Sequence, residues 1–600
     1  MTFLKKNTLK QVKNTFCKYI LKLLKLKGVF VFYISVFRTR FFKNITTNFS
    51  IFIVKFWKTI QKYCNILIPA DKHDEGYSII YRSRLVVFGV LIFVLVLMCR
   101  LVFLQTKHIY KHKTYGLSKK QPFNRLDIVD RNGKVLVNNI IVYDLYLQPS
   151  RMNNILEDVE KIQNIVPNAI NNKKELLERI QKHKDKGMVF VKKGLTLEQK
   201  QQLIDVGVQG LFFETAEKRF YTSSATNSIT GYCPAVNRCI SGIEKAMNSY
   251  LKITDNEPLN LSIDFSAQSV LRNILYKRML ETNSQGAVGI IMKIDTGEII
   301  SAVSLPDCDY NDYSSCKPND LFNRYSLGVY ELGSIFKLFS SAIALQSGID
   351  PYKKYERKEY KIGDFVIHDI DKKEQQGGSL NLIDMVKVSS NVGFAKLMED
   401  INIKDQFVFL SNLGLLNKLN TELPELGRPI YPKKWSFANA VTISYGHGIA
   451  ITPLHYVSAI ASLLKNEPVR PTFLKSNDKQ ISNYHYLDSD KYDVFKDLMR
   501  VVVNSGAGRS AYIDQYDIGG KTGTANQIKN GKYDKHSMVL SFVAGVPMNK
   551  PEYVFFIMLD RPYTDDANNN INRAATLLGK TMGYIISTIG PILNIKPISK

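Results

Sequence analysis

Residues 331–340 read ELGSIFKLFS, with Ser334 directly after Gly333 and three residues before Lys337. The apolar run that follows predicts a helix whose N-terminus lies at or near the serine. Residues i and i+3 share one face of a helix, so the hydroxyl and the amine are expected to lie together. The pattern fits either a reactive pair or an N-cap serine followed by a lysine that reaches the surface.

The spacing alone does not decide between these two interpretations. Four other serines stand three residues before a lysine: Ser249/Lys252, Ser314/Lys317, Ser462/Lys465 and Ser476/Lys479. The decision therefore depends on what else the sequence places beside Ser334.

Two further motifs follow Ser334 in the chain. Ser389 and Asn391 lie in "VKVSSNVGFAKL", and "DIGGKTGTANQ" contains the run Lys521, Thr522, Gly523 and Thr524 after two glycines. Those glycines indicate a strand edge that a substrate backbone can approach closely. Serine-x-x-lysine, serine-x-asparagine and lysine-threonine-glycine, in this order, form the signature of penicillin-recognising enzymes.

The chemistry of such a site makes a demand on Lys337. A serine hydroxyl needs a base, and a lysine serves only if its pKa falls from about 10.4 toward 7. Burial and a second cation can supply that change. The positive end of a helix would also favour an oxyanion at Ser334.

The positive charge of the chain is concentrated at its start. Residues 1–84 hold 17 Lys and Arg against 3 Asp and Glu, which accounts for +14 of the total +27. The interleaving of lysine with bulky apolar residues there suits an anionic membrane surface, so we expect no nucleic-acid partner. A tail with no function of its own fits the composition equally well.

An apolar run at 85–104, "LVVFGVLIFVLVLMCRLVFL", is long enough to cross a bilayer and is interrupted only by Arg100. It predicts an uncleaved transmembrane signal anchor at 85–105, after a basic cytoplasmic tail at 1–84. The lysines that flank the run leave its orientation open, and the whole tail favours a cytoplasmic N-terminus. A buried helix of a soluble core is the alternative.

The remaining chain predicts two α+β domains. Residues 106–255 alternate short apolar runs with charged helical stretches such as "NNKKELLERIQKHK". Residues 256–600 begin with a helix and a hairpin, "GAVGIIMKIDTGEIISAVSL", and end with two strands and a helix. Strands from both ends therefore flank a mostly helical middle.

The cysteines form no metal-binding pattern. Cys233, Cys239, Cys308 and Cys316 make two local pairs, which permit Cys233–Cys239 and Cys308–Cys316 bridges in an oxidising compartment. Four free thiols fit the sequence equally well.

Over roughly residues 80–590 the chain resembles the class B penicillin-binding proteins, which are peptidoglycan D,D-transpeptidases. Besides the three motifs, "RLDIVDRNGKVLVNN" (125–139) resembles the start of the family's pedestal domain, and Gly242-Ile243-Glu244 resembles a segment near its end. "YSLGVYELGSIFK" and "TISYGHGIAITPLH" (442–455) resemble the division-specific, FtsI-type branch. The family usually has proline where Leu332 stands.

The resemblance implies a role for each motif residue. Ser334 would be the acylated nucleophile, Lys337 its base and Ser389 a proton relay. Asn391 would hold the substrate amide, and Lys521 with Thr522, Gly523 and Thr524 would bind the terminal carboxylate. The backbone amides of Ser334 and Thr524 would form the oxyanion hole. His447 in "YGHG" is expected to have a structural role.

The resemblance also implies an architecture and partners. We expect a pedestal or dimerisation-like domain, and a transpeptidase domain with an antiparallel sheet, helices on both of its faces and a helical lobe, all in the periplasm behind the inner membrane. Expected partners are peptidoglycan stem peptides, a lipid-linked precursor, β-lactams and division-machinery membrane proteins including a glycan polymerase, with no cofactor or metal. The alternatives are an elongation-type transpeptidase, a non-catalytic division scaffold, and a β-lactamase or β-lactam sensor.

Overall fold

The computed structural model describes residues 97–98, 100, 125–167, 172–184, 187–234, 238–252, 257–369, 377–476, 478–529, 532–562 and 570–598. The chain divides into two compact units, Met1–Ser118 and Lys119–Lys600, and the elements described below belong to the second. The predicted tail at 1–84 and nearly all of the predicted anchor at 85–105 lie outside the described residues. Within the described part of the chain, no helix combines the length and apolar character needed to cross a membrane.

The second unit begins with an α+β pedestal, as the alternating pattern predicts. Its five-stranded sheet has the order β3-β2-β1-β5, and β4 also pairs with β2. The strands are β1 (Ile128–Val129), β2 (Val135–Leu147), β3 (Val189–Leu195), β4 (Leu211–Tyr221) and β5 (Leu259–Asn260). The helices are α5 (Ile155–Ile165), α6 (Lys173–Lys182), α7 (Leu197–Asp205), α8 (Asn227–Thr230), α9 (Gly242–Ala246) and α10 (Asn248–Leu251). Asn154, Asn172 and Thr196 cap the three longer helices, which explains where those helices begin.

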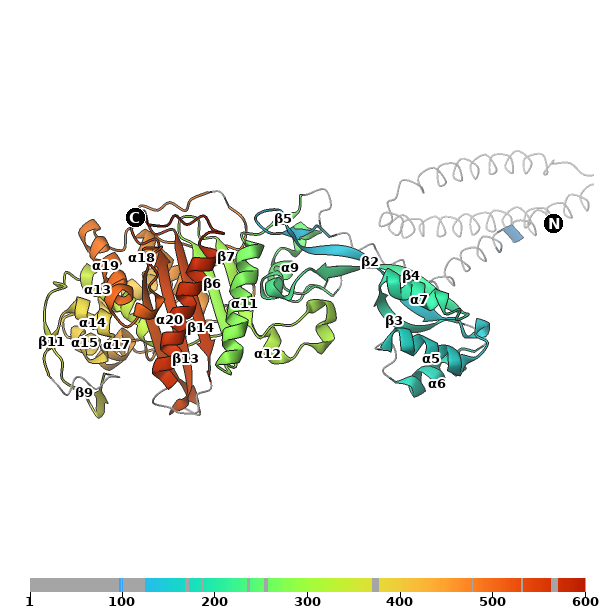
Figure 1. The fold of residues 1–600 in the computed structure, drawn as a ribbon, viewed down its shortest axis with the longest axis horizontal. Coiled ribbons are helices and arrows are strands. Elements are labelled where there is room, and N and C mark those ends of the chain that lie inside the picture. Colours follow the sequence, from blue (N-terminus) through green and yellow to red (C-terminus); the bar gives the residue numbers. More distant parts are fainter. Residues whose placement is uncertain are drawn as a thin grey trace, which may run out of the picture. The chain divides into compact units, whose positions relative to one another are not determined.

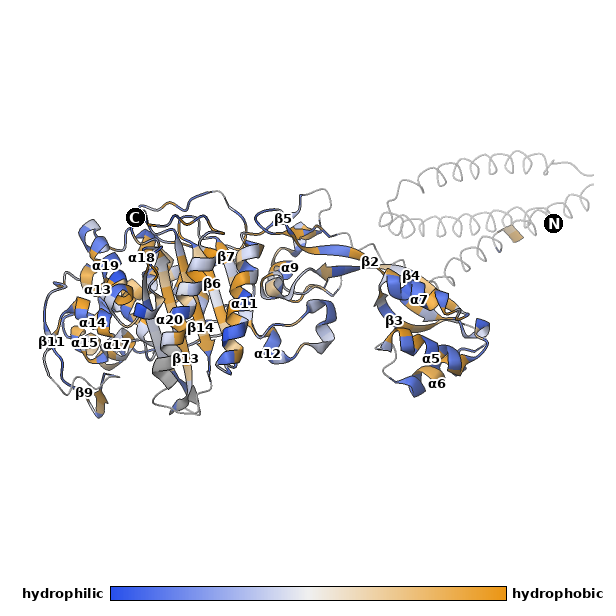
Figure 2. Ribbon diagram, in the orientation of Figure 1, coloured by the Kyte–Doolittle hydropathy of each residue, from blue (hydrophilic) through white to orange (hydrophobic). Residues whose placement is uncertain are grey.

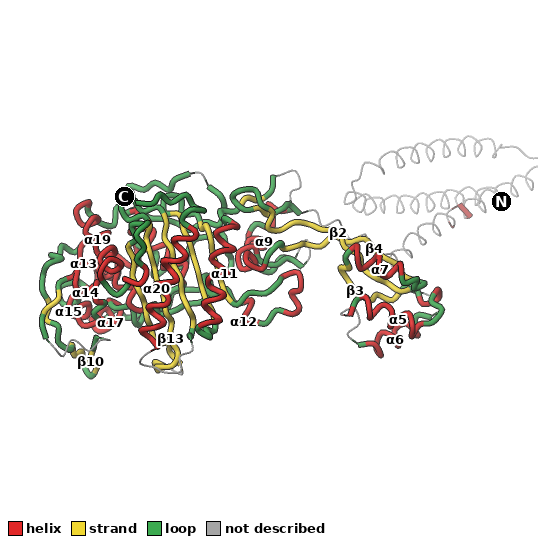
Figure 3. The backbone as a smooth tube through the Cα atoms, viewed as in Figure 1, coloured by secondary structure: helices red, strands yellow, loops and turns green. Residues whose placement is uncertain are grey.

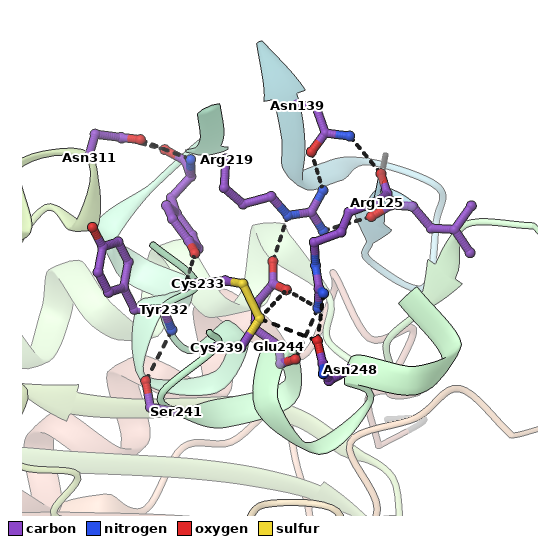
Figure 4. A network of polar contacts seen from close by, with 12 residues as sticks. Arg125, Asn139, Arg219, Tyr232, Cys233, Cys239, Ser241, Glu244, Asn248 and Asn311 are labelled. Carbon is purple, nitrogen blue, oxygen red and sulfur yellow. Dashed lines mark hydrogen bonds and ion pairs between the residues drawn. A yellow bond between two sulfur atoms is a disulfide. The ribbon is translucent and has the colours of Figure 1, made fainter. Parts of the chain in front are cut away.

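Three charged side chains are buried together where the pedestal strands meet α9. Glu244 receives Arg125 Nη2 at 2.6 Å and Arg219 Nε at 2.7 Å, and all three side chains are at most 1% exposed. Arg219 also donates to Asn139 Oδ1, and Arg125 donates to Asn248 Oδ1. Figure 4 shows Glu244 between the two guanidinium groups. A single carboxylate, that of Glu244, therefore forms ion pairs with two buried cations in the pedestal.

Both cysteine pairs are joined in disulfide bonds, Cys233–Cys239 and Cys308–Cys316. The first lies beside Glu244 in Figure 4. The two loops meet through Tyr232 and Tyr313, whose rings stack with centroids 4.0 Å apart. The bridged forms are thus the ones present in the structure.

The C-terminal part of the second unit is built on an antiparallel sheet of order β12-β13-β14-β6-β7. Its strands are β6 (Gly286–Lys293), β7 (Ile299–Leu305), β12 (Gly519–Lys529), β13 (Lys532–Val546) and β14 (Tyr553–Asp560). The predicted hairpin forms β6 and β7, and the two predicted late strands form β13 and β14. β12, which carries the lysine-threonine-glycine motif, is an edge strand.

Both faces of this sheet are buried. The strands β6, β7 and β14 have the predominantly apolar composition that such burial requires, as their colouring in Figure 2 shows. On one face α11 (Phe265–Glu281) and α20 (Asn570–Ile589) lie next to each other (Figure 1) and share a core with Ile291, Phe555 and Ile557. On the other face α18 (Pro453–Lys465) packs over β6 and β14. The prediction of helices on both faces is confirmed.

The remaining helices gather beside the β12 edge of the sheet (Figure 3) and form the helical lobe. They are α13 (Lys337–Gln346), α14 (Leu382–Val388), α15 (Asn391–Leu397), α16 (Ile403–Asn412), α17 (Phe437–Ser444) and α19 (Ser489–Ser505). The short elements are α12 (Pro318–Leu321), β8 (Tyr355–Glu356), β9 (Tyr360–Ile362), β10 (Phe365–Ile367) and β11 (Ser379–Leu380). The three sequence motifs lie where this lobe meets the edge strand.

Candidate active site

Ser334 lies in a short 3-10 helix, Gly333–Phe336, that continues directly into α13. Gly333 has a φ of +58°, and a Cβ on it would lie 2.3 Å from the Thr524 carbonyl oxygen. Only glycine allows this approach without strain. Gly333 thus allows the start of the helix to lie against β12.

Lys337 is fully buried, and its Nζ contacts the serine of its own motif and both polar residues of the second motif. It is 3.0 Å from Ser334 Oγ and 3.3 Å from Ser389 Oγ. It donates to the Ser389 carbonyl oxygen at 2.6 Å and to Asn391 Oδ1 at 2.7 Å. Both of these shorter contacts are to pure acceptors, and the contact to Ser334 is to a hydroxyl that can itself donate. A neutral Lys337 would therefore direct its lone pair at Ser334.

The second motif lies at a break between two helices. Ser389 ends α14 in the left-handed conformation, with φ of 59°, and Asn391 begins α15. This geometry turns the Ser389 hydroxyl toward both lysines, since Lys521 Nζ donates to it at 2.8 Å. Asn391 is occupied at both ends, because its Nδ2 also donates to the His368 carbonyl oxygen at 3.1 Å.

The third motif lies on the edge strand β12. Lys521 is fully buried and donates to the Thr522 carbonyl oxygen at 3.1 Å. Thr522 and Thr524 are two residues apart in the strand and so point to the same face. A Cβ on Gly523 would lie 2.3 Å from Ser541 Oγ and 2.6 Å from the Leu332 carbonyl oxygen. Gly523 thus allows the segment before Ser334 to pack against the strand.

The electrostatics of the site favour a neutral Lys337. Burial and the charge of Lys521 lower the pKa of Lys337 well below 10.5, and the Asp369 carboxylate opposes this change. Burial lowers the pKa of Lys521 to about 7. The structure therefore supplies both causes that the sequence argument required, which are desolvation and a second cation.

Comparison with protein families agrees with this geometry. Residues 287–582 match the family model of the penicillin-binding protein transpeptidase domain, and residues 120–257 match that of the penicillin-binding protein dimerisation domain. The chain belongs to the class B penicillin-binding proteins. It has a serine D,D-transpeptidase domain that acts on peptidoglycan.

Individual relatives support the family and differ in subclass. This penicillin-binding protein is 29% identical to the "Probable peptidoglycan D,D-transpeptidase FtsI" of Caulobacter vibrioides, over 79% of its own length and 82% of the relative's. It is 24% identical to "Stage V sporulation protein D" of Bacillus subtilis, over 87% of both chains. A crystal structure of a putative peptidoglycan glycosyltransferase from Atopobium parvulum shares the fold, with a TM-score of 0.59 at 21% identity, over 79% of this chain and 98% of that one.

Asp369 is a residue of this site that the sequence analysis missed. Its Oδ1 accepts from the backbone N–H groups of Asn391 at 2.6 Å and Val392 at 3.0 Å, and both oxygens accept from Ser390 Oγ at 2.9 Å. Arg357 Nε donates to Oδ2 at 3.0 Å. Asp369 thus caps α15 and positions the serine-x-asparagine motif. No spacing rule in the sequence points to it.

His447 packs beside the site of this penicillin-binding protein without joining the lysine network. Its ring lies 5.3 Å from Tyr445 and 5.7 Å from Tyr533, measured between centroids. Burial is the main cause that lowers the pKa of His447 to about 4, and any charge on Lys337 acts in the same direction. A histidine that stays neutral at neutral pH fits the predicted structural role.

Proposed function

We propose that this transpeptidase cross-links stem peptides during septal cell-wall synthesis, with Ser334 as its acylated nucleophile. The observation that carries the proposal is the 3.0 Å contact between Ser334 Oγ and a buried Lys337 whose pKa is lowered. No other serine-x-x-lysine pair in the described residues has a fully buried lysine.

Acylation begins when Ser334 Oγ attacks the carbonyl carbon of the D-Ala-D-Ala bond. Lys337 Nζ takes the hydroxyl proton as the new C–O bond forms. The backbone amides of Ser334 and Thr524 would stabilise the oxyanion, in keeping with the position of Ser334 in the first turn before α13.

Departure of D-alanine requires a proton at its nitrogen. Ser389 Oγ lies within hydrogen-bonding distance of both Lys337 and Lys521, so it can pass a proton to the leaving amine as the C–N bond breaks. Lys521 with Thr522 and Thr524 would bind the terminal carboxylate, and Gly523 allows the close packing behind them. An amine of a neighbouring strand then attacks the Ser334 ester and forms the cross-link, while Asn391 orients the substrate amide.

The septal role rests on the FtsI-type segments in the sequence and on the name of the Caulobacter relative. We also propose that the chain is anchored in the inner membrane through residues 85–105, with its catalytic domain in the periplasm and division proteins, including a glycan polymerase, as partners. An elongation-type role is the alternative. A tagged protein that concentrates along the lateral wall rather than at the septum would favour it.

The direct test is acylation by a fluorescent penicillin in membranes. We expect a labelled band at 68.4 kDa that disappears in Ser334→Ala. Ser314→Ala is the matched control, because Ser314 has the same spacing to a lysine but lies outside the site, and it should keep the label. Undiminished labelling of Ser334→Ala would refute the assignment.

A further inference from the structure

A groove of about 750 Å³ is lined in part by the segment that precedes Ser334. Its walls include Tyr330 and Glu331, the segment 430–432, and Asn526 and Gln527 at the far part of β12. Glu331 is three residues before Ser334, and Gln527 is three residues after Thr524. The groove is therefore lined by segments that directly precede Ser334 and directly follow Thr524 in the chain, and its volume lies in the range of ligand-binding pockets.

The direction of a bound peptide follows from the proposed function, on which this step rests. The terminal carboxylate lies at Lys521 and Thr522, near the start of β12, and the scissile carbonyl lies at Thr524. An extended peptide along the free edge of β12 then places its upstream residues beside Asn526 and Gln527. The groove thus receives the part of the donor peptide that stays on the enzyme.

One part of the groove wall is acidic. The Glu331 carboxylate accepts the Gly448 N–H at 2.9 Å and the Tyr533 hydroxyl at 3.1 Å. Burial raises its pKa, and no cation contributes to that pKa within the part of the chain that the structure describes. A half-buried carboxylate with neutral neighbours is a binding point for an ammonium group.

Another part of the groove wall is basic. Arg561 Nε donates to Gln527 Oε1 at 2.7 Å, and Nη1 donates to Gln285 Oε1 at 2.8 Å. Asp560 lies between Arg561 and the buried Arg324. Its Oδ1 is 3.9 Å from Arg561 Nε, and its Oδ2 is 3.7 Å from Arg324 Nε. Two guanidinium groups therefore face one carboxylate. Arg561 is 48% exposed as a side chain, so it is accessible to an anion.

We propose that this groove binds the donor stem peptide by its own charges, with a side-chain ammonium at Glu331 and a carboxylate at Arg561. Cross-linking joins strands of one kind, so the amine that an acceptor strand offers is also present on each donor. The substrate class is thus a D-Ala-D-Ala peptide that carries a free diamino residue and a free carboxylate upstream of the scissile bond.

The test uses the full-length protein in detergent and four synthetic peptides that end in D-Ala-D-Ala. The side-chain amine is free or acetylated, and the upstream carboxylate is free or amidated. The measurement is the peptide concentration that halves the rate of labelling by fluorescent penicillin, which requires no turnover of the peptide. In the wild-type protein, blocking either group should raise that concentration about tenfold, as expected for hydrogen bonds to charged groups.

Each variant should lose only its own preference. Glu331→Gln should no longer distinguish the free amine from the acetylated amine, and Arg561→Gln should no longer distinguish the carboxylate from the amide. Glu552→Gln and Arg509→Gln change exposed residues outside the groove and should keep both preferences. A variant that weakens all four peptides equally would contradict the proposal, since a merely structural role has that effect.

The outcomes separate this proposal from the proposed function. Failure of the wild-type protein to take up penicillin at Ser334 would refute the function itself. If penicillin labels Ser334 normally, but all four peptides slow the labelling equally or none of them slows it, only the groove proposal is overturned.

Discussion

The rate at which a penicillin acylates this protein should fall as the pH rises above about 7. Burial lowers the pKa of Lys521 to about 7, and only the charged form of Lys521 attracts the carboxylate of the ligand. On the acid side the rate should rise with pH, because Lys337 must lose its proton before it can act as a base. The second-order rate constant reports these groups in the free enzyme, so its pH profile should be bell-shaped with a maximum near or below pH 7.

The size of the expected pH effect follows from the pKa of the buried Lys521. A pKa of about 7 in place of 10.5 means that burial has removed about 5 kcal/mol of preference for the charged form. At pH 8 about one-tenth of the molecules would retain the Lys521 charge, and the rate constant should fall about tenfold per pH unit beyond that point. Lys337 and Lys521 share the Ser389 hydroxyl, so the two limbs belong to the coupled pair.

The assay compares a fluorescent penicillin with its methyl ester between pH 5 and 9. The ester has no carboxylate for Lys521 to attract, so it should react more slowly at pH 6 and show no alkaline limb. If both ligands lose reactivity in parallel above pH 7, the charge of Lys521 is not the cause. If the free acid reacts undiminished at pH 9, the pKa of the buried lysine is not lowered in the way that its burial implies.

Three substitutions test other parts of the structure. Glu244→Gln leaves two buried guanidinium groups without a carboxylate and should lower the free energy of unfolding by about 3–5 kcal/mol. The loss of penicillin labelling with rising urea concentration measures this free energy. A change below about 1 kcal/mol would contradict the stabilising role of the ion pairs in the pedestal. Gly333→Ala should slow acylation at least about 100-fold because its Cβ meets a β12 carbonyl, whereas Gly348→Ala, also at positive φ but with open space, should leave the acylation rate unchanged. Asp369→Asn should shift the acid limb of the acylation profile to lower pH, because the carboxylate raises the pKa of Lys337; a slower reaction with an unshifted limb would mean that Asp369 acts only as a helix cap.

Contiguous patterns made much of the fold predictable. The β6–β7 hairpin follows from apolar runs around a TG turn, and β13, β14 and α20 follow from apolar runs of the right length. The meeting of the three motifs does not follow from contiguous patterns, because only the family resemblance implied that they lie together. The structure adds the reason: Gly333 and Gly523 permit the segment around Ser334 and the strand β12 to touch.

Contacts between irregular segments could not be predicted. Asp369 lies in a loop with no periodicity, and its role appears only when the loop folds over the start of α15. The sequence does not decide between disulfide bonds and free thiols, because pairing depends on the distance between Cα atoms. This distance is 3.9 Å for Cys233–Cys239 and 5.7 Å for Cys308–Cys316. The Glu331 contact with Tyr533 joins residues 202 positions apart, with no motif to connect them.

The positions of Lys337 and Lys521 determine which of these two side chains carries a positive charge. Lys337 and Lys521 both contact Ser389 Oγ, at 3.3 Å and 2.8 Å, so two charged ammonium groups there would repel each other without water to screen them. A carboxylate that binds at Lys521 stabilises the charge on that lysine and raises its pKa. The charge held there lowers the pKa of Lys337, which favours the neutral form of Lys337. In the proposed mechanism, binding of the substrate carboxylate at Lys521 and deprotonation of Lys337 are therefore linked, and each must favour the other by the same free energy.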